Sequence, residues 1–249
     1  MSSTAYRVNS EQYSARIYLS RTTLRMTWVK ICGMTNLEDA LTAVEAGADA
    51  VGFVFYEKSP RNISVAAARE IVEKLPERVE KVGVFVNELP ARVSAIADEA
   101  GLTAVQFHGD EHQNPEMYAL DRRTFLCIPA KCVEVTWRKR GKAIGSFMAL
   151  PKNLGAIMLD SGTPGLRGGT GKSFDWLEAR AWVSAMNQLH HPVAIAGGLN
   201  IENVGKAIAI LKPWGVDVAS GVEARPGKKD PEKVRAFVKV VREADRKTG

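Results

Sequence analysis

The sequence is poor in cysteine and has no long apolar run. Its three cysteines, Cys32, Cys127 and Cys132, cannot all pair with one another, and none lies in a CxxC or Cys/His zinc pattern. We therefore expect a reducing, cytoplasmic location and no structural metal. No apolar stretch approaches the roughly 20 residues that cross a bilayer, so we also expect a soluble protein without a membrane partner.

Nucleotide-binding motifs are missing as well. Gly171-Lys172-Ser173 resembles the end of a phosphate loop, but the motif G-x-x-x-x-G-K-[ST] requires glycine at position 166, where Leu166 stands. The glycine fingerprint of dinucleotide-binding folds is also absent, because CGMTNL follows the first predicted strand. The first absence disfavours a nucleoside triphosphate site. The second disfavours an open doubly wound sheet, which we keep only as an alternative fold.

Basic residues exceed acidic ones, 34 against 28, which gives a net charge of +6 and a pI of about 9.2. The Lys and Arg residues are nevertheless scattered among nearly as many carboxylates, and no aromatic RNA-binding motif accompanies them. This pattern indicates a solvated basic surface that attracts an anionic small substrate, and it disfavours nucleic acid as a partner.

Residues 1–27 differ in composition from the rest of the chain. They are rich in Ser, Thr and Arg, contain Glu11 as their only acidic residue, and lack the apolar core of a secretory signal. An organelle transit peptide has this composition, and so does a segment translated from a start codon upstream of a true start at Met26, which we favour. Either origin predicts a disordered or loosely docked extension before one domain over residues 28–249.

From Trp28 onward, short β-branched runs alternate with segments of helical period. The predicted strands cover residues 29–32, 50–55, 81–86, 104–108, 125–130, 156–160, 193–197 and 216–220. The predicted helices cover residues 37–46, 65–74, 91–100, 115–123, 137–148, 174–189, 201–211 and 231–244. Eight such units within about 250 residues predict an α/β fold, a single (β/α)₈ TIM barrel.

Several predicted helix ends carry capping signals. Asn36, Ser64 and Ser173 precede helical segments and are the expected N-caps, and Gly47 and Gly101 follow helical segments as expected C-terminal stops. The segments AGADAVGF, AGLTAVQF, NLGAIML and WGVDVAS each end a helix near glycine and enter a strand. This weak internal repetition agrees with one repeated unit.

In a TIM barrel, functional residues lie at the carboxyl ends of the strands and in the loops that follow them. Gly197-Gly198 follows the seventh predicted strand, and Ser220-Gly221 stands at the end of the eighth. Glycines there let backbone N–H groups approach an anion, so the two pairs predict a phosphate site. The alternative is that these glycines only form tight turns.

Two residues at strand ends are candidates for proton transfer. Asp160 closes an otherwise apolar strand, and a buried carboxyl without a charge partner can act as a general acid. The alternative is an aspartate that accepts hydrogen bonds from the amides of its own loop. Cys32 ends the first strand, where a thiol with thiolate character could abstract a proton, although buried cysteines usually act as small hydrophobes.

The remaining candidates are weaker. Arg61, in the loop after the second strand, offers a planar fork that suits a carboxylate, unless it is merely solvated. His108, at the end of the fourth strand, could shuttle protons or simply form hydrogen bonds. We interpret Cys127 and Cys132 as packing residues and Lys228-Lys229-Asp230 as solvated loop charges.

Seven segments taken together form a recognisable pattern. They are VKICGMTNLEDA, GADAVGFVFYEKSPRNIS, VGVFVN, VQFHGDE, MLDSGTPGLRGGTGKSFDW, AIAGGLNIENV and VDVASGVEARPGKKD. In this order they resemble the phosphoribosylanthranilate isomerase family of the tryptophan pathway. The resemblance extends from about Val29 to the end of the chain, and it weakens at FLCIPAKCVEV, where the family more often has a Lys-Ala turn.

The resemblance implies an Amadori rearrangement of N-(5-phosphoribosyl)anthranilate to 1-(2-carboxyphenylamino)-1-deoxyribulose 5-phosphate, with no metal or organic cofactor. It implies that Asp160 protonates the furanose ring oxygen and that Cys32 removes the C2 proton. The partner would be this phosphorylated small molecule, and the protein would be a monomer or a homodimer. The GGTGK loop would form a flexible cover over the barrel mouth.

The resemblance also assigns contacts to the substrate. Arg61 would bind the anthranilate carboxylate, and backbone groups around Gly198, Ser220 and Gly221 would bind the phosphate. The weaker candidates for substrate contacts are Gln106, His108 and Asp217.

Other functions are compatible with such a barrel. Indole-glycerol phosphate synthase and the histidine-pathway isomerase are further phosphosugar barrels, and Cys32 stands where the latter has its first catalytic aspartate. A catalytically silent barrel that only binds a phosphorylated ligand is another alternative, but intact Cys32 and Asp160 argue against it. A basic nucleic-acid binder is the least favoured, and salt-dependent retention on nucleic acid would test it.

Overall fold

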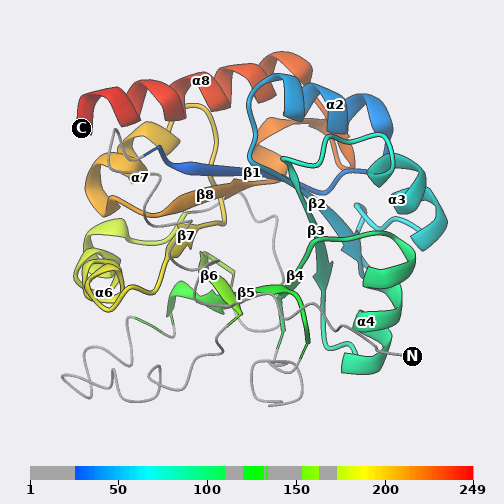
Figure 1. Cartoon of the computed structure of the whole chain (residues 1–249). Coiled ribbons are helices and arrows are strands. Elements are labelled where there is room, and N and C mark those ends of the chain that lie inside the picture. The colour runs from blue at the N-terminus through cyan, green and yellow to red at the C-terminus, as the bar shows by residue number, and fades with distance from the viewer. Residues whose placement is uncertain (1–25, 110–119, 132, 134–152, 163–172, 249) are drawn as a thin grey trace, which may run out of the picture.

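The computed structural model describes residues 26–109, 120–131, 133, 153–162 and 173–248. Eight parallel strands form a closed barrel in the order β1-β2-β3-β4-β5-β6-β7-β8, which confirms the predicted (β/α)₈ fold (Figure 1). The strands are β1 (Trp28–Cys32), β2 (Ala50–Phe55), β3 (Glu80–Phe85), β4 (Ala104–Phe107), β5 (Arg123–Pro129), β6 (Leu154–Asp160), β7 (Val193–Ile195) and β8 (Gly215–Val218).

Helices surround the barrel wherever the connections are described (Figure 1). They are α2 (Leu37–Glu45), α3 (Val65–Val72), α4 (Pro90–Glu99), α6 (Trp176–Gln188), α7 (Val204–Leu211) and α8 (Pro231–Thr248). Helix α8 packs against both α2 and α7, so the last helix closes the ring beside the first. None of the helices in the described part of the chain is long and apolar enough to cross a membrane.

Three predicted helix ends differ from the structure. Ser173 is not the cap of α6, because the Asp175 side chain accepts hydrogen bonds from the Leu177 and Glu178 N–H groups and the helix begins at Trp176. Helix α7 begins three residues later than expected, since residues 201–203 form a turn. The predicted helix over 115–123 is wrong at its end, where residues 120–122 are bends and Arg123 starts β5.

Other predicted caps are confirmed. The Asn36 side chain accepts from the Asp39 N–H at 2.9 Å, and that of Ser64 accepts from the Ala67 N–H at 3.2 Å. The rest of the predicted helix over 115–123, the helix over 137–148 and nearly all of the expected cover loop lie outside the described residues. The same holds for residues 1–25, which include most of the expected N-terminal extension.

Alternating side chains of the strands form two apolar layers. One set faces the helices, and the other fills the barrel interior near the amino ends of the strands. In the interior layer the Trp28 ring stacks on Phe125 at 5.3 Å and on Trp214 at 4.8 Å between centroids. The small side chains of Ala50 and Ala104 in the same cluster leave room for these rings. This layer closes the barrel at the end opposite the site.

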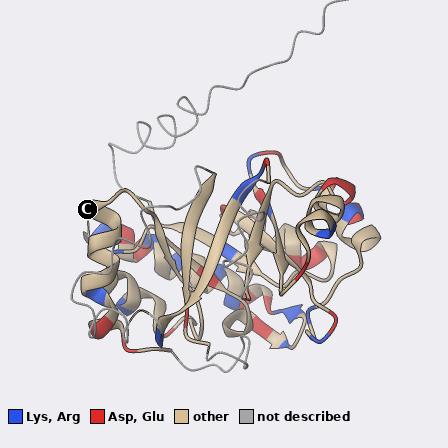
Figure 2. Cartoon of the chain, turned by 90° about the horizontal axis from the view of Figure 1, so that it is seen from below, with Lys and Arg blue, Asp and Glu red and all other residues tan. Residues whose placement is uncertain are grey.

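Basic and acidic residues are interspersed along the ribbon (Figure 2). In this view, positions of both signs occur on the helices and strands of the described residues. The view therefore shows no basic stripe, of the kind that follows a nucleic-acid backbone, along the described part of the chain.

The aromatic layer leads to a first prediction. Replacing Trp28, which is 4% exposed, by alanine leaves a cavity between two rings and should lower the free energy of unfolding by about 3–5 kcal/mol. Urea unfolding followed by circular dichroism measures this. Leu177→Ala is the control, since Leu177 is 69% exposed and should change stability by less than about 0.5 kcal/mol. A loss below about 1 kcal/mol in Trp28→Ala would show that the layer does not stabilise the barrel.

Candidate active site

A cavity of about 360 Å³ opens at the carboxyl ends of the strands. The structure brings nearly all of the predicted site residues to it, and only Gly221 is not part of its lining. The predicted residues that line the cavity are Cys32, Arg61, Gln106, His108, Asp160, Gly197, Gly198, Asp217 and Ser220. They come from six of the eight barrel units, so no single segment contains the site.

Cys32 lies beside a buried ion pair that the sequence analysis did not consider. Lys30, two residues earlier on β1, also points into the barrel, and its Nζ donates to Asp217 Oδ1 on β8 at 2.9 Å. The Lys30 ammonium also interacts electrostatically with the Cys32 thiol. Lys30 is fully buried, and although burial alone would lower its pKa, Asp217 and Cys32 raise it on balance.

The surroundings of Cys32 have two opposing effects on the pKa of its thiol. Burial raises the pKa of Cys32, and the positive charge of Lys30 partly offsets this increase. Gly52 on β2 provides the space, because a Cβ there would lie 2.7 Å from Cys32 Sγ and 3.0 Å from Lys30 Cε. The charge of Lys30 therefore favours the Cys32 thiolate, against the effect of burial.

Asp160 ends β6 on the other side of the cavity from Cys32 on β1. It is 7% exposed, and its Oδ1 accepts a hydrogen bond from the Gly162 N–H at 2.6 Å. The loop-capping alternative is thus present in the structure. It does not exclude proton transfer, since no described residue donates a hydrogen bond to Oδ2.

The loops after β7 and β8 form a cradle of backbone N–H groups. Gly197 and Gly198 have φ values of 75° and 67°, which favour glycine and end β7 at Ile195, earlier than predicted. A Cβ on Gly221 would lie 1.9 Å from the Leu199 carbonyl oxygen, so only glycine lets the two loops approach. The N–H groups of Gly198, Ser220 and Gly221 donate to no acceptor among the described residues. This arrangement suits a phosphate.

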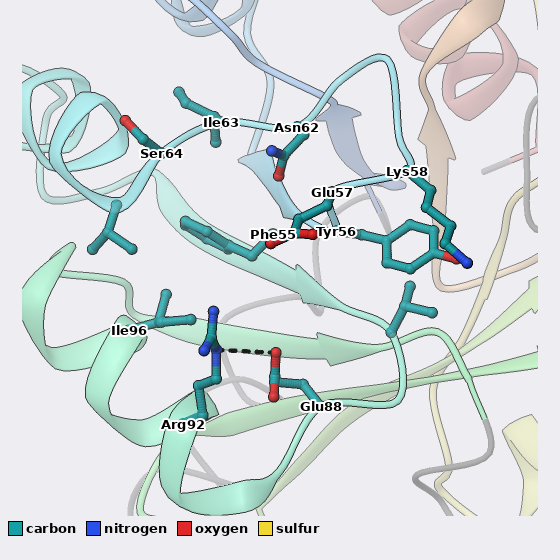
Figure 3. Close-up of a pocket in the computed structure, with 12 residues that line it drawn as sticks. Phe55, Tyr56, Glu57, Lys58, Asn62, Ile63, Ser64, Glu88, Arg92 and Ile96 are labelled. Carbon is teal, nitrogen blue, oxygen red and sulfur yellow. Dashed lines mark ion pairs between the residues drawn. The ribbon is translucent and has the colours of Figure 1, made fainter.

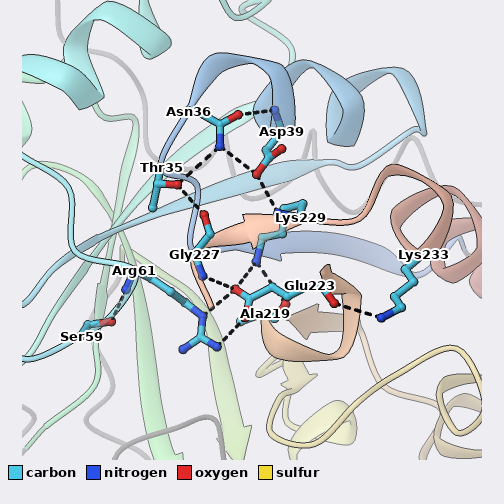
Figure 4. A network of polar contacts seen from close by, with 10 residues as sticks. All are labelled: Thr35, Asn36, Asp39, Ser59, Arg61, Ala219, Glu223, Gly227, Lys229 and Lys233. Carbon is cyan, nitrogen blue, oxygen red and sulfur yellow. Dashed lines mark hydrogen bonds and ion pairs between the residues drawn. The ribbon is translucent and has the colours of Figure 1, made fainter. Parts of the chain in front are cut away.

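Arg61 is held in place by a second carboxylate, Glu223 (Figure 4). Its Nε and Nη2 each donate to Glu223 at 2.8 Å, one to each carboxylate oxygen. This bidentate bond raises the pKa of Arg61. Nη1 donates to no described residue, so one edge of the guanidinium stays available to a ligand.

The prediction that Lys228-Lys229-Asp230 are solvated loop charges is wrong, most clearly for Lys229. The Lys229 side chain is fully buried, and its Nζ donates to Glu223 at 3.0 Å and to the Ala219 carbonyl oxygen at 3.1 Å. Burial lowers its pKa despite Glu223. The short hairpin of β9 (Glu223–Arg225) and β10 (Lys228–Lys229) folds the lysine under the site, which local sequence could not reveal.

Lys228 and Asp230, the two neighbours of Lys229, also form hydrogen bonds within the protein. Lys228 Nζ donates to Asp39 Oδ1 at 2.6 Å, and the Lys229 N–H donates to the other oxygen at 2.7 Å. Asp230 accepts hydrogen bonds at the start of α8 from the Glu232 and Lys233 N–H groups. Lys228, Lys229 and Asp230 therefore all have hydrogen-bond partners within the protein.

Gln106 and His108 face the cavity from the end of β4. Gln106 is 2% exposed, and its Oε1 is buried without a hydrogen-bond donor. A buried polar atom without a partner favours a ligand that supplies one. His108, Cys127 and Asp160 place one ligand atom each within 4.8 Å of one another, so they are the residues of this site that could hold a metal.

The comparisons with known proteins agree with this geometry. Residues 29–240 match the family described as N-(5'phosphoribosyl)anthranilate (PRA) isomerase. The N-(5'-phosphoribosyl)anthranilate isomerase of Azotobacter vinelandii is 46% identical over 223 residues, which cover 86% of this chain and 97% of that protein. The crystal structure of the isomerase from Thermotoga maritima matches with a TM-score of 0.73 at 41% identity, covering 88% of this chain and 100% of that one.

The chain belongs to the PRA isomerase family. It is an isomerase of tryptophan biosynthesis, as the resemblance in the sequence implied. A further solved PRA isomerase, 38% identical with a TM-score of 0.70, covers 88% of this chain and 100% of that one, and contains reduced 1-(o-carboxyphenylamino)-1-deoxyribulose 5-phosphate.

Lys30 and Glu223 are the residues of this PRA isomerase that the sequence analysis missed. A signal for Lys30 existed, since a lysine two positions before Cys32 on an otherwise apolar strand must share the inward face of the thiol. No comparable signal marked Glu223, because it lies in the short hairpin after β8 and meets Arg61 across 162 residues of sequence.

A larger groove of about 620 Å³ lies beside the mouth of this PRA isomerase (Figure 3). Phe55, Asn62 and Ile96 line it, and a Glu88–Arg92 ion pair at 3.2 Å lies on one side. It contains none of the predicted site residues. The smaller cavity at the strand ends is therefore the candidate active site.

The Glu223 network leads to a second prediction. Glu223→Gln leaves Arg61 and Lys229 without their counter-charge and should cost about 3–5 kcal/mol of unfolding free energy at pH 7. Burial opposes ionisation of Glu223, but Arg61 and Lys229 outweigh it and lower its pKa below the ordinary 4.5. This stabilisation is present above pH 4.5 and is lost as the pH falls through the lower folded-state pKa.

The wild-type protein should therefore lose stability more steeply than Glu223→Gln as the pH falls below 4.5. Urea unfolding at pH 7 and at several acidic pH values measures this difference. Glu73→Gln is the matched control, since Glu73 forms an exposed ion pair with Arg69 and should change stability by less than about 0.5 kcal/mol. Parallel acid limbs in the wild type and Glu223→Gln would contradict the assignment.

Proposed function

We propose that this PRA isomerase converts N-(5'-phosphoribosyl)anthranilate to 1-(2-carboxyphenylamino)-1-deoxyribulose 5-phosphate with Cys32 as general base and Asp160 as general acid. The observation that supports these roles is their placement. A thiol on β1 and a carboxyl on β6 face one cavity from opposite walls, and N–H groups that have no acceptor among the described residues lie after β7 and β8. A sugar phosphate anchored there would lie with its ring between the two groups.

The reaction proceeds by transfer of protons alone. Asp160 in its acid form gives a proton to the furanose ring oxygen, the C1–O bond breaks, and the anilino nitrogen forms a protonated Schiff base with C1. The Cys32 thiolate then takes the proton from C2, and the electron pair moves through C1 to the nitrogen to give an enolamine. Tautomerisation of the enolamine yields the ketone, so no atom or electron is gained or lost overall.

Arg61 is proposed to bind the anthranilate carboxylate. Glu223 occupies Nε and Nη2, and this fixes the plane of the guanidinium before substrate arrives. Nη1 then offers its hydrogens to a carboxylate without rearrangement of the side chain. The buried Oε1 of Gln106 can accept a hydrogen bond from a sugar hydroxyl, and His108 and Asp217 line the same cavity as weaker candidates.

Lys30 is proposed as the positioning residue for the base. Its ammonium contacts the thiol from below, and Asp217 holds the ammonium in place at 2.9 Å. A cation in contact with the sulfur favours the thiolate over the thiol. Cys32 can then remove a proton at neutral pH although burial raises its pKa.

Two substitutions test the proton-transfer roles. Asp160→Asn and Cys32→Ser should each lower kcat/KM at least about 1,000-fold, because neither side chain can transfer the required proton at neutral pH. The decay of the fluorescence of freshly prepared N-(5'-phosphoribosyl)anthranilate measures the rate. Asp121→Asn, at an exposed aspartate, is the control and should retain full activity. Activity within about tenfold of wild type in either variant would rule out the assigned role.

The pH dependence of the rate tests Lys30. Because Lys30 lowers the pKa of Cys32, Lys30→Met should shift the rising limb of kcat/KM to higher pH. Asp217 raises the pKa of Cys32, so the double variant Lys30→Met/Asp217→Asn should shift it less. Lys81→Met is the control, since Lys81 is 5% exposed but hydrogen bonds to Pro76 away from the thiol. An unchanged limb in Lys30→Met would show that Lys30 has only a structural role.

A further inference from the structure

Cys127 is a buried thiol beside the active site that the proposed reaction does not use. Its Sγ, a ring nitrogen of His108 and a carboxylate oxygen of Asp160 all lie within 4.8 Å of one another. No other group of His, Cys, Asp and Glu residues in the described part of the chain meets in this way. The three side chains thus form a compact cluster of nitrogen, sulfur and oxygen ligands.

The barrel register explains why these three residues meet. In β4 and β5 Phe107 pairs with Leu126, so His108 and Cys127 are the next neighbours along the two strands. In β5 and β6 Cys127 pairs with Met158, and Asp160 is two residues further on the same face. Cys127 and Met158 both belong to the interior apolar layer. The cluster is therefore built on three adjacent strands, which hold their side chains more precisely than loops do.

The ligand set matches the chemistry of zinc. Zn²⁺ binds thiolate, imidazole and carboxylate in tetrahedral sites, and three protein ligands leave a fourth position for water or another ligand. At bond lengths of about 2.0–2.3 Å the ligand atoms of one ion are roughly 3.5 Å apart. Side-chain rotations of about 1 Å would bring the three atoms onto a single ion. The fourth position would face the cavity, since His108 and Asp160 line it.

We propose that His108, Cys127 and Asp160 bind one Zn²⁺ reversibly and that the bound ion inhibits the isomerase. Binding replaces the thiol proton of Cys127, which is released to solvent, and uses the neutral imidazole of His108. It also occupies the Asp160 carboxylate, which then cannot carry the proton for the sugar ring. The inhibition rests on the proposed role of Asp160, but the binding does not.

Cobalt is the probe for the binding, because Co²⁺ takes the place of Zn²⁺ and gives a thiolate charge-transfer band in the near ultraviolet. The apoprotein is titrated with CoCl₂ under anaerobic conditions. We expect a band that saturates at one equivalent in the wild type and in Cys32→Ser, and that is lost in Cys127→Val. Valine suits the apolar surroundings of this position, which include Phe125 and Met158. Far-ultraviolet circular dichroism checks that each variant is folded.

Enzyme assays test the inhibition separately. ZnCl₂ should inhibit the wild type competitively, EDTA should restore the rate, and Cys127→Val should keep its basal activity while needing at least about tenfold more zinc for half inhibition. His108→Phe should also weaken the cobalt band, because it removes the imidazole ligand.

The outcomes separate the two proposals. A saturable band that depends on Cys127 supports the metal site even if Asp160→Asn proves active, in which case only the role of Asp160 fails. A band that persists in Cys127→Val, or no band in the wild type at millimolar Co²⁺, would overturn the site. Equal zinc inhibition of the wild type and Cys127→Val would overturn the inhibition through this cluster.

Discussion

The ion pair between Lys30 on β1 and Asp217 on β8 links the fold to the chemistry of the site. The two residues are 187 positions apart, and their side chains meet only because the first and last strands pair and close the barrel. A buried ammonium without a partner would be strongly unfavourable, so the closed barrel and the ion pair depend on each other. The same ammonium lies against Cys32, so closure of the barrel also determines the electrostatic environment of the proposed base.

A second buried cluster surrounds Arg61, the residue proposed to bind the anthranilate carboxylate. Glu223 holds Arg61 with both carboxylate oxygens and pairs with the buried Lys229, which in turn is anchored through its backbone to Asp39 (Figure 4). In this second cluster Arg61 lines the cavity and its carboxylate partner Glu223 lies behind it. In the first cluster the order is reversed, since Asp217 lines the cavity and the buried Lys30 lies beneath it. The N–H cradle after β7 and β8 adds further partial positive charge. A substrate with a carboxylate and a phosphate fits this distribution of positive charge around the cavity. The charges scattered over the surface do not add to it.

Much of the fold could be predicted from sequence periodicity, for a physical reason. Short runs of β-branched residues have to be strands buried on both faces, and their strict alternation with amphipathic segments leaves a parallel barrel as the simplest arrangement. The helix start was predicted wrongly where neighbouring polar residues compete to cap the same helix. Ser173 and Asp175 could both cap the same helix, and only the geometry of the entering chain selects the aspartate. Gly197 and Gly198 were recognisable because glycine is the residue that readily adopts a positive φ.

The sequence by itself determined which residues stand at the carboxyl ends of the strands, because strand order and the two-residue period of side chains are local properties. Cys32, Asp160 and the glycines after β7 and β8 could be found in this way. Tertiary structure alone decided which charges are compensated. It buried Lys229 against Glu223, directed Lys30 towards Asp217 and placed Cys127 beside His108 and Asp160. These contacts join distant segments, and an isolated side chain carries no information on the partner that closure of the barrel will bring to it.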